Sequence, residues 1–507
     1  MTKTTLFKNA LLVGYSANTT YDIIVKDGIV AAIQPSGEIQ HVKTDDVVDV
    51  QKLDSPWVSP SLIDWHTHTK LNALHSRRLD LQKATSVQQV LDQVVTAIHD
   101  PKFAPTYNVN FCAINLRNAG WQDPERLTRE ALDKISTERP IFLFFNGYHS
   151  ICCNSRGLEH AGHKAEGHSG YVYEDEAFAM FQVINNVNEN VIDDWICKES
   201  EYAAWVGNFD WQPLTTTGLS AWKRRYDKGF RSLRVHVGMY TEHLQYAIDR
   251  GYKTGDDVVG CGGLIKVGPF KVVTDGSLGS QTAYCHDHYP GLPDNFGMLA
   301  YKPEALGELI KRGTENGFRM AIHAIGDHAN QLTLQALARA EKKVLPGSTI
   351  EHAQLLSFED LPLFRSLGVI ASIQPCHLVD DRELCHRFWP GREHRAYPFR
   401  WLVDAGVPIK MGSDCPVAPL QPWEAIAVAI TRAGSGDERN PFCKEQIIDL
   451  EVAWAASTSN GKKKLEVGDR ADIVILKANP LECDAAGLRA MKVSGTMLGG
   501  DWTYKAF

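Results

Sequence analysis

The sequence predicts an α/β fold in which parallel strands alternate with helices. Three observations lead to this prediction. Apolar, β-branched runs recur between residues 57 and 412, and several are followed by segments with helical periodicity. Both ends of the chain carry short strand-like runs joined by turns. A long stretch at about residues 71–228, rich in Trp, Asn, Glu and His, interrupts the alternation. We therefore expect a β/α body, a small β domain and an inserted lid region.

The small β domain is predicted from both termini. At the N-terminus, residues 7–15, 21–25 and 29–33 read as strands, with a turn at Asp27 and Gly28. At the C-terminus, residues 471–476, 493–497 and 502–504 have the same character. Neither end alone supplies enough strands to bury a sheet face, so the two ends are expected to form one discontinuous domain.

The β/α body is predicted from eight apolar runs and the helices between them. The expected strands are residues 57–65, 141–146, 232–237, 264–274, 319–323, 348–352, 369–374 and 408–412. The expected helices are residues 329–340, 358–367 and 422–430, with a weaker candidate at 306–312 that contains Gly307. Strands of this type are covered by helices on both faces of the sheet.

Composition excludes several classes of protein. The 507 residues include 53 Lys+Arg against 61 Asp+Glu, for a net charge of −8, and 44% of the chain is hydrophobic. Ordinary apolar content excludes a disordered chain, and the acidic balance without a basic stripe disfavours nucleic acid as a partner. We expect a globular enzyme that acts on a small molecule.

The expected location is the cytoplasm. No window of about 18 uninterrupted apolar residues occurs, so no membrane-spanning segment is predicted. The 11 cysteines are an odd number without CxxC pairs or a regular spacing. In a chain of this length they indicate reduced thiols in a reducing compartment.

The sharpest local motif is Asp64-Trp65-His66-Thr67-His68, at the end of an apolar run. Alternate residues of a strand point to the same side, so His66 and His68 project together, with Asp64 one step earlier. Two imidazoles and a carboxylate suit a divalent metal. A hydrogen-bonded histidine pair in a loop would give the same motif, so the motif alone does not establish a metal site.

Other strand ends carry matching residues. His323 and His352 each follow an apolar strand, and Asp414 ends another. In a β/α barrel the carboxyl ends of the strands form the active face, so these three residues should meet His66 and His68 at one mouth. Five independent placements of polar residues would be needed to explain this pattern otherwise. The sequence therefore predicts a divalent metal site.

These elements belong to a longer series of motifs that spans nearly the whole chain. The others are residues 270–280 (FKVVTDGSLGS), 323–327 (HAIGD), 350–354 (IEHAQ), 371–375 (ASIQP), 412–414 (GSD) and 465–472 (LEVGDRAD). In this order they resemble the amidohydrolase superfamily, within it the N-substituted formamide deformylase-like (YtcJ-like) branch of metal-dependent hydrolases. The resemblance implies a TIM (β/α)8 barrel over residues 59–455 and a composite β-sandwich from residues 1–58 plus 456–507.

The resemblance also implies a ligand set. His66, His68 and Asp414 would hold one metal, and His323 and His352 a second. Lys271 matches the lysine that is carbamylated and bridges two metals in this branch. A free ammonium cannot bind a cation, so Lys271 must be neutral or carbamylated if it lies between metals. An ordinary salt bridge to Asp275, or a lysine at a sheet edge, remains the alternative.

The chemistry expected from this set is hydrolysis of an amide C–N bond by metal-activated hydroxide. A divalent metal lowers the pKa of bound water toward about 7, and Asp414 could shuttle the proton to the leaving amine. Two further histidines are candidate catalytic residues. His149 resembles the family's segment near the substrate and could hydrogen-bond the amide or the oxyanion, and His377 follows a strand and could line the mouth. Each could equally be a loop histidine.

Candidate substrate-binding residues come from the same motifs. Gln281 stands where the family usually has Arg, and Trp65 replaces a usual small residue. Losing that Arg removes a bidentate clamp for an anion, so a carboxylate-bearing substrate is disfavoured. Gln374 lies in the ASIQP motif. Asp327 could orient His323 from the outer shell or merely cap the following helix.

Alternatives remain open at this stage. A nucleobase-type deaminase would use one metal and an acid in a His-x-x-Glu element, whereas here the acid after His323 comes one residue late, at Asp327. A scaffold protein that has lost its ligands is disfavoured because the predicted ligands are all present. Histidine and carboxylate ligands serve Zn, Fe and Mn, so one or two ions of any of these are compatible, with Zn the first choice. Homo-oligomerisation is compatible with the scaffold.

Overall fold

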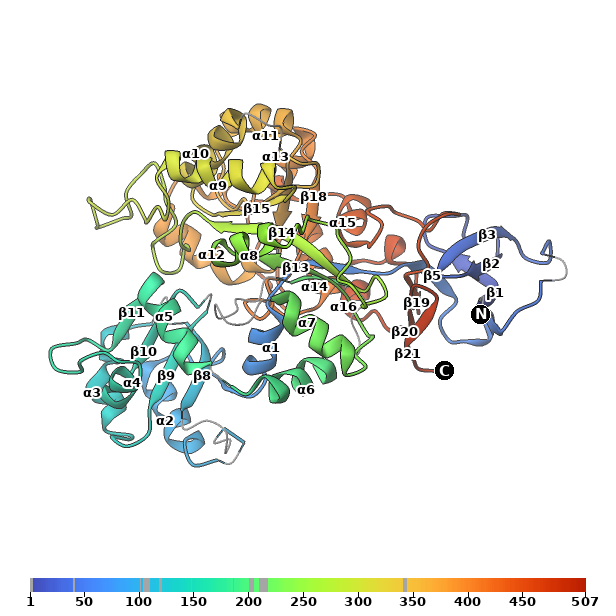
Figure 1. Ribbon diagram of the computed structural model, residues 1–507. Coiled ribbons are helices and arrows are strands. Elements are labelled where there is room, and N and C mark those ends of the chain that lie inside the picture. Colours follow the sequence, from blue (N-terminus) through green and yellow to red (C-terminus); the bar gives the residue numbers. More distant parts are fainter. Residues whose placement is uncertain are drawn as a thin grey trace.

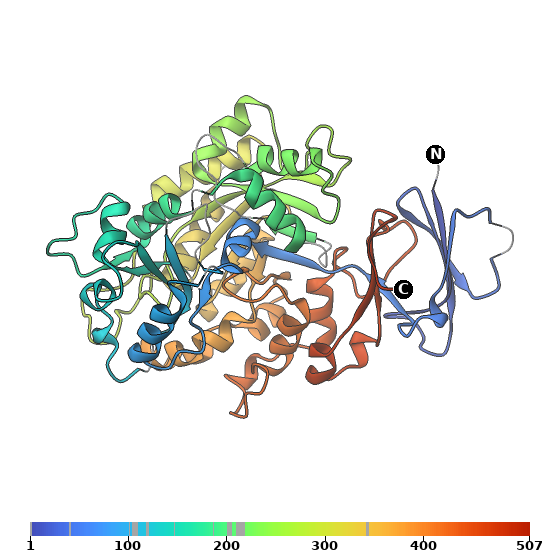
Figure 2. The same ribbon diagram turned by 90° about the horizontal axis from the view of Figure 1, so that it is seen from below.

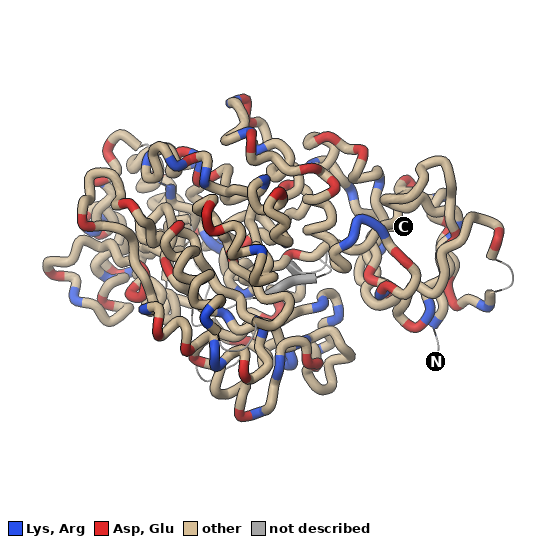
Figure 3. Tube along the Cα trace, turned by 90° about the horizontal axis from the view of Figure 1, so that it is seen from above, with Lys and Arg blue, Asp and Glu red and all other residues tan. Residues whose placement is uncertain are grey.

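The described residues form three β-sheets in the protein, which is presented as a computed structural model (Figure 1). The structure describes residues 3–39, 42–100, 102–103, 110–117, 121–146, 148–185, 187–199, 205–208, 218–340 and 344–507. Figures 1 and 2 place both termini on one sheet, at the opposite end of the molecule from the segment at about residues 79–184. Acidic and basic residues are interspersed along the trace (Figure 3).

The central sheet, called here the parallel sheet, has eight strands in the order β18-β17-β16-β15-β14-β13-β12-β6. All of its pairings are parallel. The strands are β6 (Ile63–Thr67), β12 (Trp205–Asn208), β13 (Arg234–Met239), β14 (Ile265–Val273), β15 (Met320–Ala324), β16 (Thr349–His352), β17 (Ile370–Ile373) and β18 (Ile409–Met411). Its largest apolar core continues into the surrounding helices.

The first and last strands of this order also meet. Beyond β18, the Asp414 N–H donates to the His66 carbonyl at 2.7 Å, and the His68 N–H donates to the Cys415 carbonyl at 2.8 Å. Thr67 and Cys415 form a parallel bridge. These contacts bring the two ends of the strand order to the same place, where His66 and Asp414 lie.

Helices alternate with these strands along the chain. They are α1 (Thr69–His75), α6 (Glu189–Glu199), α7 (Gly218–Asp227), α8 (Leu244–Asp249), α9 (Pro303–Glu315), α10 (Asp327–Arg339), α11 (Leu361–Leu367), α12 (His377–Phe388), α13 (Phe399–Asp404), α14 (Pro422–Thr431), α15 (Leu450–Ser457) and α16 (Ala485–Arg489). Helices α9, α10, α11 and α14 confirm the four predicted helical segments, with small shifts at their ends. None of the described helices is long and apolar enough to cross a membrane.

The second sheet, the terminal sheet, joins the two ends of the chain in the order β21-β20-β19-β5-β1-β2-β3, with β4 paired to β1. Its strands are β1 (Thr4–Leu12), β2 (Tyr21–Lys26), β3 (Ile29–Pro35), β4 (Asp46–Asp49), β5 (Trp57–Pro60), β19 (Ile473–Leu476), β20 (Val493–Leu498) and β21 (Asp501–Lys505). One apolar cluster contains residues from both ends, including Phe7, Ile23, Ile473 and Met497. The ends of the chain therefore share a core, whereas the two packed layers of a sandwich stay a prediction.

The predicted strand at residues 57–65 is two strands in two sheets. Strand β5 pairs with β1 and β19 in the terminal sheet, and β6 pairs with β12 in the parallel sheet. Pro60 ends β5 and has no N–H to continue a ladder. The next N–H, of Ser61, donates to the Asp472 carbonyl at 2.9 Å. A continuous apolar run thus passes from one domain to the other.

The third sheet has five strands in the order β11-β10-β9-β8-β7. They are β7 (Leu79–Asp80), β8 (Phe111–Leu116), β9 (Ile141–Phe145), β10 (Ser150–Cys153) and β11 (Tyr171–Tyr173), accompanied by α2 (Val87–Ala97), α3 (Arg129–Asp133), α4 (Ser155–His160) and α5 (Glu174–Ile184). Alternate residues of β8 enter two different cores: Phe111 and Ala113 belong to one, Cys112 and Ile114 to the other. We call the segment from β7 to α5 the inserted unit.

Two sequence predictions need correction here. Residues 141–146, predicted as a strand of the β/α body, form β9 of the inserted unit. A strand that is buried on both faces reads as a continuous apolar run in either sheet, so the run could not identify its sheet. The predicted insertion at about 71–228 is also wider than the separate sheet, because β12 (Trp205–Asn208) lies within it and joins the parallel sheet.

Candidate metal centre and cavity

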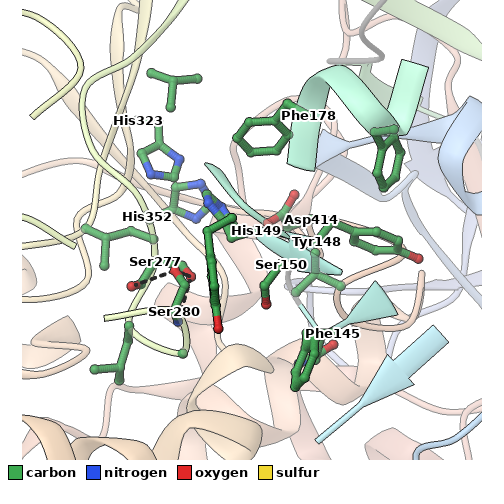
Figure 4. Close-up of a pocket in the computed structure, with 18 of the residues that line it drawn as sticks. Phe145, Tyr148, His149, Ser150, Phe178, Ser277, Ser280, His323, His352 and Asp414 are labelled. Carbon is green, nitrogen blue, oxygen red and sulfur yellow. Dashed lines mark hydrogen bonds between the residues drawn. The ribbon is translucent and has the colours of Figure 1, made fainter. Parts of the chain in front are cut away.

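A cavity of about 1470 Å³ lies between the carboxyl ends of the parallel strands and the inserted unit. The parallel sheet and the loops that follow its strands contribute His66, His68, Lys271, His323, His352 and Asp414 to its lining. The inserted unit contributes Phe145, Tyr148, His149 and Phe178 (Figure 4). All six predicted ligands therefore line one cavity, five of them expected there from their positions at strand ends and Lys271 from the family resemblance.

Three of these side chains form the tightest group. One potential ligand atom each from His66, His352 and Asp414 lies within 4.8 Å of the other two, and all three residues are buried. His66 Nε2 is 3.5 Å from Asp414 Oδ1, and the His66 and His352 rings are 5.0 Å apart between centroids. Two imidazoles and a carboxylate at this spacing fit a divalent cation such as zinc.

His68 and His323 extend this group on either side. His68 Nε2 lies 3.0 Å from Asp414 Oδ1. The His323 ring lies 4.5 Å from the His352 ring, and His323 Nε2 is 3.2 Å from the Gly276 carbonyl. The predicted division into one site with His66, His68 and Asp414 and another with His323 and His352 is therefore less sharp in the structure, because His352 groups with His66 and Asp414.

Local backbone geometry fixes two of these ligands. His352 has φ +73° and Asp414 has φ +57°, in the left-handed region that non-glycine residues seldom adopt. Such conformations persist only where the surrounding structure holds them, and they concentrate at functional sites. Both residues lie at the end of a strand or just beyond it, where the chain turns away from the ladder.

The approach of β18 to β6 depends on Gly412. A Cβ at this position would lie 2.7 Å from the backbone N and 2.9 Å from the Cβ of His66. Asp64 ties the same two strands together, since its Oδ1 accepts from the N–H of Ser413 at 2.9 Å and of His66 at 3.1 Å. Asp64 thus has a structural role next to His66, and burial raises its pKa to about 6.

Glu351 sets the orientation of His66. His66 Nδ1 donates to Glu351 Oε2 at 2.6 Å, and both side chains are almost fully buried. Burial alone would raise the pKa of Glu351, but His66 and Lys271 hold it at about 2. With Nδ1 donating to Glu351, His66 Nε2 is the acceptor nitrogen, and it faces Asp414 Oδ1 at 3.5 Å and Lys271 Nζ at 3.4 Å. A carboxylate behind a histidine in this way is the usual arrangement behind a metal.

Three histidines of the group, His66, His323 and His352, have lowered pKa values. Burial and the neighbouring Lys271 lower the pKa of His66, and they lower that of His323 to about 3. Burial and His323 hold the pKa of His352 well below its usual value. A metal binds the neutral imidazole, so these shifts prepare the ligands. His352 Nδ1 is buried without a hydrogen-bond partner among the described residues, and a cation would satisfy such an atom.

Lys271 lies beneath the cavity in β14. It is 2% exposed, and its Nζ is 3.4 Å from His66 Nε2. Burial lowers its pKa, against the opposite effect of Glu351 and Asp414. The alternative partner, Asp275, accepts from the backbone N–H groups of Gly326 at 2.8 Å, Tyr284 at 2.9 Å and Ile325 at 3.0 Å. Lys271 Nζ is therefore close to His66 Nε2, whereas the Asp275 carboxylate is engaged by three backbone N–H groups.

The two candidate catalytic histidines both line the cavity. His149 Nδ1 is 2.7 Å from Glu174 Oε2. Burial lowers the pKa of His149, but the Glu174 carboxylate outweighs it, so the net shift is upward. His377, the first residue of α12, lies with its Nε2 3.7 Å from Asp414 Oδ2. Burial favours the neutral acid of Asp414, but His66, His68 and His352 keep its pKa well below the usual range.

The structure separates the candidate substrate-binding residues into those that line the cavity and those that do not. Gln281 lines the cavity, whereas Trp65, Gln374 and Asp327 are not among the lining residues. Alternate residues of β6 face opposite sides, so Trp65 points away from the side of His66. Its ring lies against Lys410 instead, with Lys410 Nζ 3.3 Å from the ring centroid. Gln374 Nε2 donates to the Ser372 carbonyl at 3.0 Å. Asp327 Oδ2 pairs with Arg395 at 2.6 Å, and its Oδ1 accepts from the N–H groups of His286 and His328 at 3.1 and 3.0 Å. Among the described residues, no hydrogen bond or ion pair joins Asp327 to His323.

Sequence reasoning missed several cavity residues. Gln354 lines the cavity and donates from Nε2 to Asp381 Oδ2 at 2.8 Å. Arg117 of the inserted unit pairs with Asp380 of α12 at 2.8 Å, and both line the cavity. Gln354 follows His352 by two positions in a recognised motif, which was a usable signal. The Arg117–Asp380 pair joins residues far apart in the chain, and no sequence signal predicts it.

Comparison with known proteins supports a single family. A sequence profile described as "Amidohydrolase family" matches residues 57–504. The putative amidohydrolase YtcJ of Bacillus subtilis (strain 168) is 22% identical, over 96% of each chain. The N-substituted formamide deformylase of Arthrobacter pascens is 24% identical, over 95% of this chain and 94% of its own length. The structure of an uncharacterized metal-dependent hydrolase from Pyrococcus horikoshii OT3 is similar in fold, with a TM-score of 0.76 and 21% identity, over 96% of this chain and 99% of that chain.

Proposed function

The chain belongs to the amidohydrolase family of hydrolases that act on carbon–nitrogen bonds, and on that premise we propose that it hydrolyses the amide bond of an N-acyl or N-formyl amine. The observation that carries the proposal is the grouping of His66, His352 and Asp414 within 4.8 Å, at the edge of a large cavity. The similarity to a formamide deformylase supports the same class of substrate.

A divalent metal fits this group and would, when bound, lower the pKa of a water molecule toward about 7 and polarise the substrate carbonyl. His66, His352 and Asp414 would hold it, with His68, His323 and Lys271 close enough to complete one site or a second. We propose zinc first, with iron or manganese as alternatives, and a carbamate on Lys271. The lowered pKa of Lys271 supports the carbamate, because only a neutral amine can react with CO2.

Asp414 is the proposed proton shuttle. Its low pKa keeps it ionised at neutral pH, so it can accept a proton from the attacking water. The water oxygen forms the new bond to the carbonyl carbon, the C–N bond breaks, and Asp414 returns the proton to the amine that leaves. A positioned base of this kind contributes typically about 10²–10⁴-fold to the rate.

His149 and His377 would bind the reacting amide. The pKa of His149 is raised, which favours an N–H that can donate to the carbonyl oxygen as negative charge develops on it. His377 Nε2 is buried without a hydrogen-bond partner among the described residues, although it lies near Asp414. It could therefore contact the leaving amine as Asp414 protonates it.

The size of the cavity bears on the substrate. At about 1470 Å³ it exceeds the roughly 300–1,000 Å³ typical of small-molecule sites. Aromatic side chains of the inserted unit line one side (Figure 4). We propose Gln281 as a substrate contact, since it is the member of its predicted set that lines the cavity. A deaminase is less well supported, because Asp327 is paired with Arg395 outside the lining.

We also propose a closed (β/α)8 barrel for the parallel sheet, on the strength of the bonds between β6 and the segment after β18. A cytoplasmic location is proposed for the enzyme, because none of the described cysteines forms a disulfide. A small-molecule amide is its proposed partner, and assembly with further copies of the chain is compatible with the fold.

The test is a turnover assay on N-formyl and N-acyl amines, combined with elemental analysis of the purified protein. We expect bound divalent metal and hydrolysis of at least one amide, lost on chelation and restored by zinc, manganese or iron. Density at Lys271 in a crystal structure would show the carbamate. A metal-loaded protein that deaminates a heterocyclic ring and leaves every amide intact would overturn the proposal.

A further inference from the structure

Two residues of the inserted unit, His149 and Glu174, form a buried pair at the cavity. His149 Nδ1 lies 2.7 Å from Glu174 Oε2, and the Glu174 N–H donates to the His149 carbonyl at 2.9 Å. The pair is thus joined by both side chain and backbone. His149 lies just before β10, and Glu174 begins α5 after β11, so the antiparallel β10–β11 pairing brings them together.

The second carboxylate oxygen of Glu174 reaches out of the inserted unit. Its Oε1 accepts from Ser280 Oγ at 3.0 Å and from Thr282 Oγ1 at 2.5 Å. Both hydroxyls belong to the loop that follows β14 of the parallel sheet. Glu174 therefore holds His149 with one oxygen and the parallel sheet's loop with the other.

The backbone is conformationally restricted on both sides of the contact between Glu174 and Thr282. Glu174 has φ +47°, a left-handed conformation that is strained for a residue with a side chain. Gly276 lies opposite, where a Cβ would stand 2.0 Å from Thr282 Oγ1 and 3.0 Å from Glu174 Oε1. The chain thus accepts an unfavourable backbone at one side of the contact and has glycine at the other.

We propose that Glu174 is the positioning residue for His149: it fixes the ring through Nδ1 and leaves Nε2 to meet the substrate in the cavity. A carboxylate on one ring nitrogen sets both the tautomer and the orientation of an imidazole. Ser280 and Thr282, which donate to its other oxygen, fix the Glu174 carboxylate in turn. The substrate contact rests on the proposed function, whereas the fixed ring does not.

Kinetics test the catalytic part of the proposal. In Glu174→Ala, kcat should fall toward the roughly 10²–10³-fold loss expected for His149→Ala, with KM little changed. Glu174→Gln keeps the shape and should show a smaller loss. The double variant with both alanines should lose no more than His149→Ala alone, because Glu174 acts through His149. Additive losses in the double variant would overturn the proposal.

Glu176→Gln is the matched control. Glu176 lies in the same first turn of α5, is exposed, and pairs with His163 at 3.1 Å outside the cavity lining. It should retain wild-type kcat and KM. Bound metal, measured by elemental analysis, should be equal in every variant, so that a loss of turnover cannot be attributed to loss of the metal.

Proton NMR separates this proposal from the proposed function. The hydrogen-bonded Nδ1 proton of His149 should give a low-field resonance in the wild type, absent in His149→Gln and in Glu174→Ala, and retained in Glu176→Gln. A resonance that survives in Glu174→Ala would overturn the positioning role. If the resonance behaves as expected but no amide is hydrolysed, the proposed function fails and the fixed ring stands.

Discussion

The two walls of the cavity hold their functional side chains in different ways. On the side of the parallel sheet, His66, His352 and Asp414 are fixed by strand register and by close backbone contacts, such as that of Gly412 with His66. On the side of the inserted unit, His149 is held by the side chain of Glu174. Changes in the first wall should therefore affect metal binding and stability and, at Asp414, proton transfer as well, whereas changes in the second should lower turnover with the metal retained.

The largest expected effect is that of Asp414→Asn. Asparagine tolerates the left-handed backbone of Asp414, so the fold should be kept while the carboxylate is lost. We expect kcat to fall by about 10²–10⁴-fold, measured with the best amide substrate. Asp404→Asn, an exposed change in α13, is the control. Activity within a few-fold of wild type would show that another residue moves the proton.

Glu351→Gln tests the sheet wall through its supporting residue. Glutamine cannot match the charge-assisted bond that the buried Glu351 carboxylate accepts from His66 Nδ1. Metal affinity should fall by about 10–100-fold, measured by competition with a chelator. The exposed Glu359→Gln should leave affinity unchanged. Equal affinities in the two variants would mean that His66 needs no support to bind the metal.

Gly412→Ala should damage the same wall through the backbone. The new Cβ would lie 2.7 Å from the His66 backbone N, so β18 and β6 must separate. We expect a loss of about 1–3 kcal/mol in the free energy of unfolding, measured by chemical denaturation, together with less bound metal. Gly307→Ala, with no atom within 4 Å of its Cβ and inside α9, should instead stabilise by about 0.5–1 kcal/mol.

Gly276→Ala is the contrasting change at the joint between the walls. Here the new Cβ would meet the side chains of Thr282 and Glu174. Because the Cβ would lie 2.0 Å from Thr282 Oγ1, the loop around Thr282 must move by about 1 Å. A 1 Å misplacement of a reacting group can cost about 10²-fold, and this contact reaches the substrate only through His149, so we expect kcat to fall by about tenfold. Bound metal should be retained. If Gly276→Ala loses metal as Gly412→Ala does, the proposed difference between the two walls is wrong.

The smallest expected effect concerns the stability of the fold at low pH. It comes from His236 in β13 (Arg234–Met239), which does not line the cavity. Burial, then Lys266, Lys410 and other cations, lowers the pKa of His236 from 6.5 to about 3. The unfolded chain therefore binds a proton that the folded chain rejects, so stability is complete above about pH 6.5 and falls as the pH drops toward 3.

From pH 7 to pH 5.5 this single histidine should cost about 1 kcal/mol. His236→Gln should flatten the decline by that amount in denaturation curves at the two pH values, whereas the exposed His99→Gln should not. An unchanged slope in His236→Gln would assign the acid sensitivity to other groups, including those of the metal centre.

Much of the sheet wall could be predicted from the sequence, for a physical reason. His66, His323, His352 and Asp414 each lie at or just after the end of an apolar strand, and parallel strands deliver such ends to one edge. The prediction that Trp65 contacts the substrate was wrong, because Trp65 precedes His66 in β6 and therefore faces the other side of the sheet. Strand β12 was missed because its four residues, Trp-Val-Gly-Asn, include glycine and asparagine, which are depleted in strands.

The inserted wall could be predicted only in part. His149 was found through its resemblance to a family segment, but Glu174, its partner, is 25 positions away, and Thr282 lies 108 positions beyond Glu174. Such contacts depend on how the inserted unit docks, which no local pattern encodes. Glu351 was visible in a motif, but its role requires the buried contact with His66 that only the fold supplies.

The terminal sheet can be completed only late in synthesis, because its strands come from both ends of the chain. Strand β5 pairs with β1 on one edge and with β19, near the other end of the chain, on its second edge. While the ribosome is still making the intervening residues, that second edge has no native partner, and an open strand edge invites association with other chains. The N-terminal strands are thus synthesised before β19, but their sheet is completed only after β19 has left the ribosome, so β5 keeps an open edge until then.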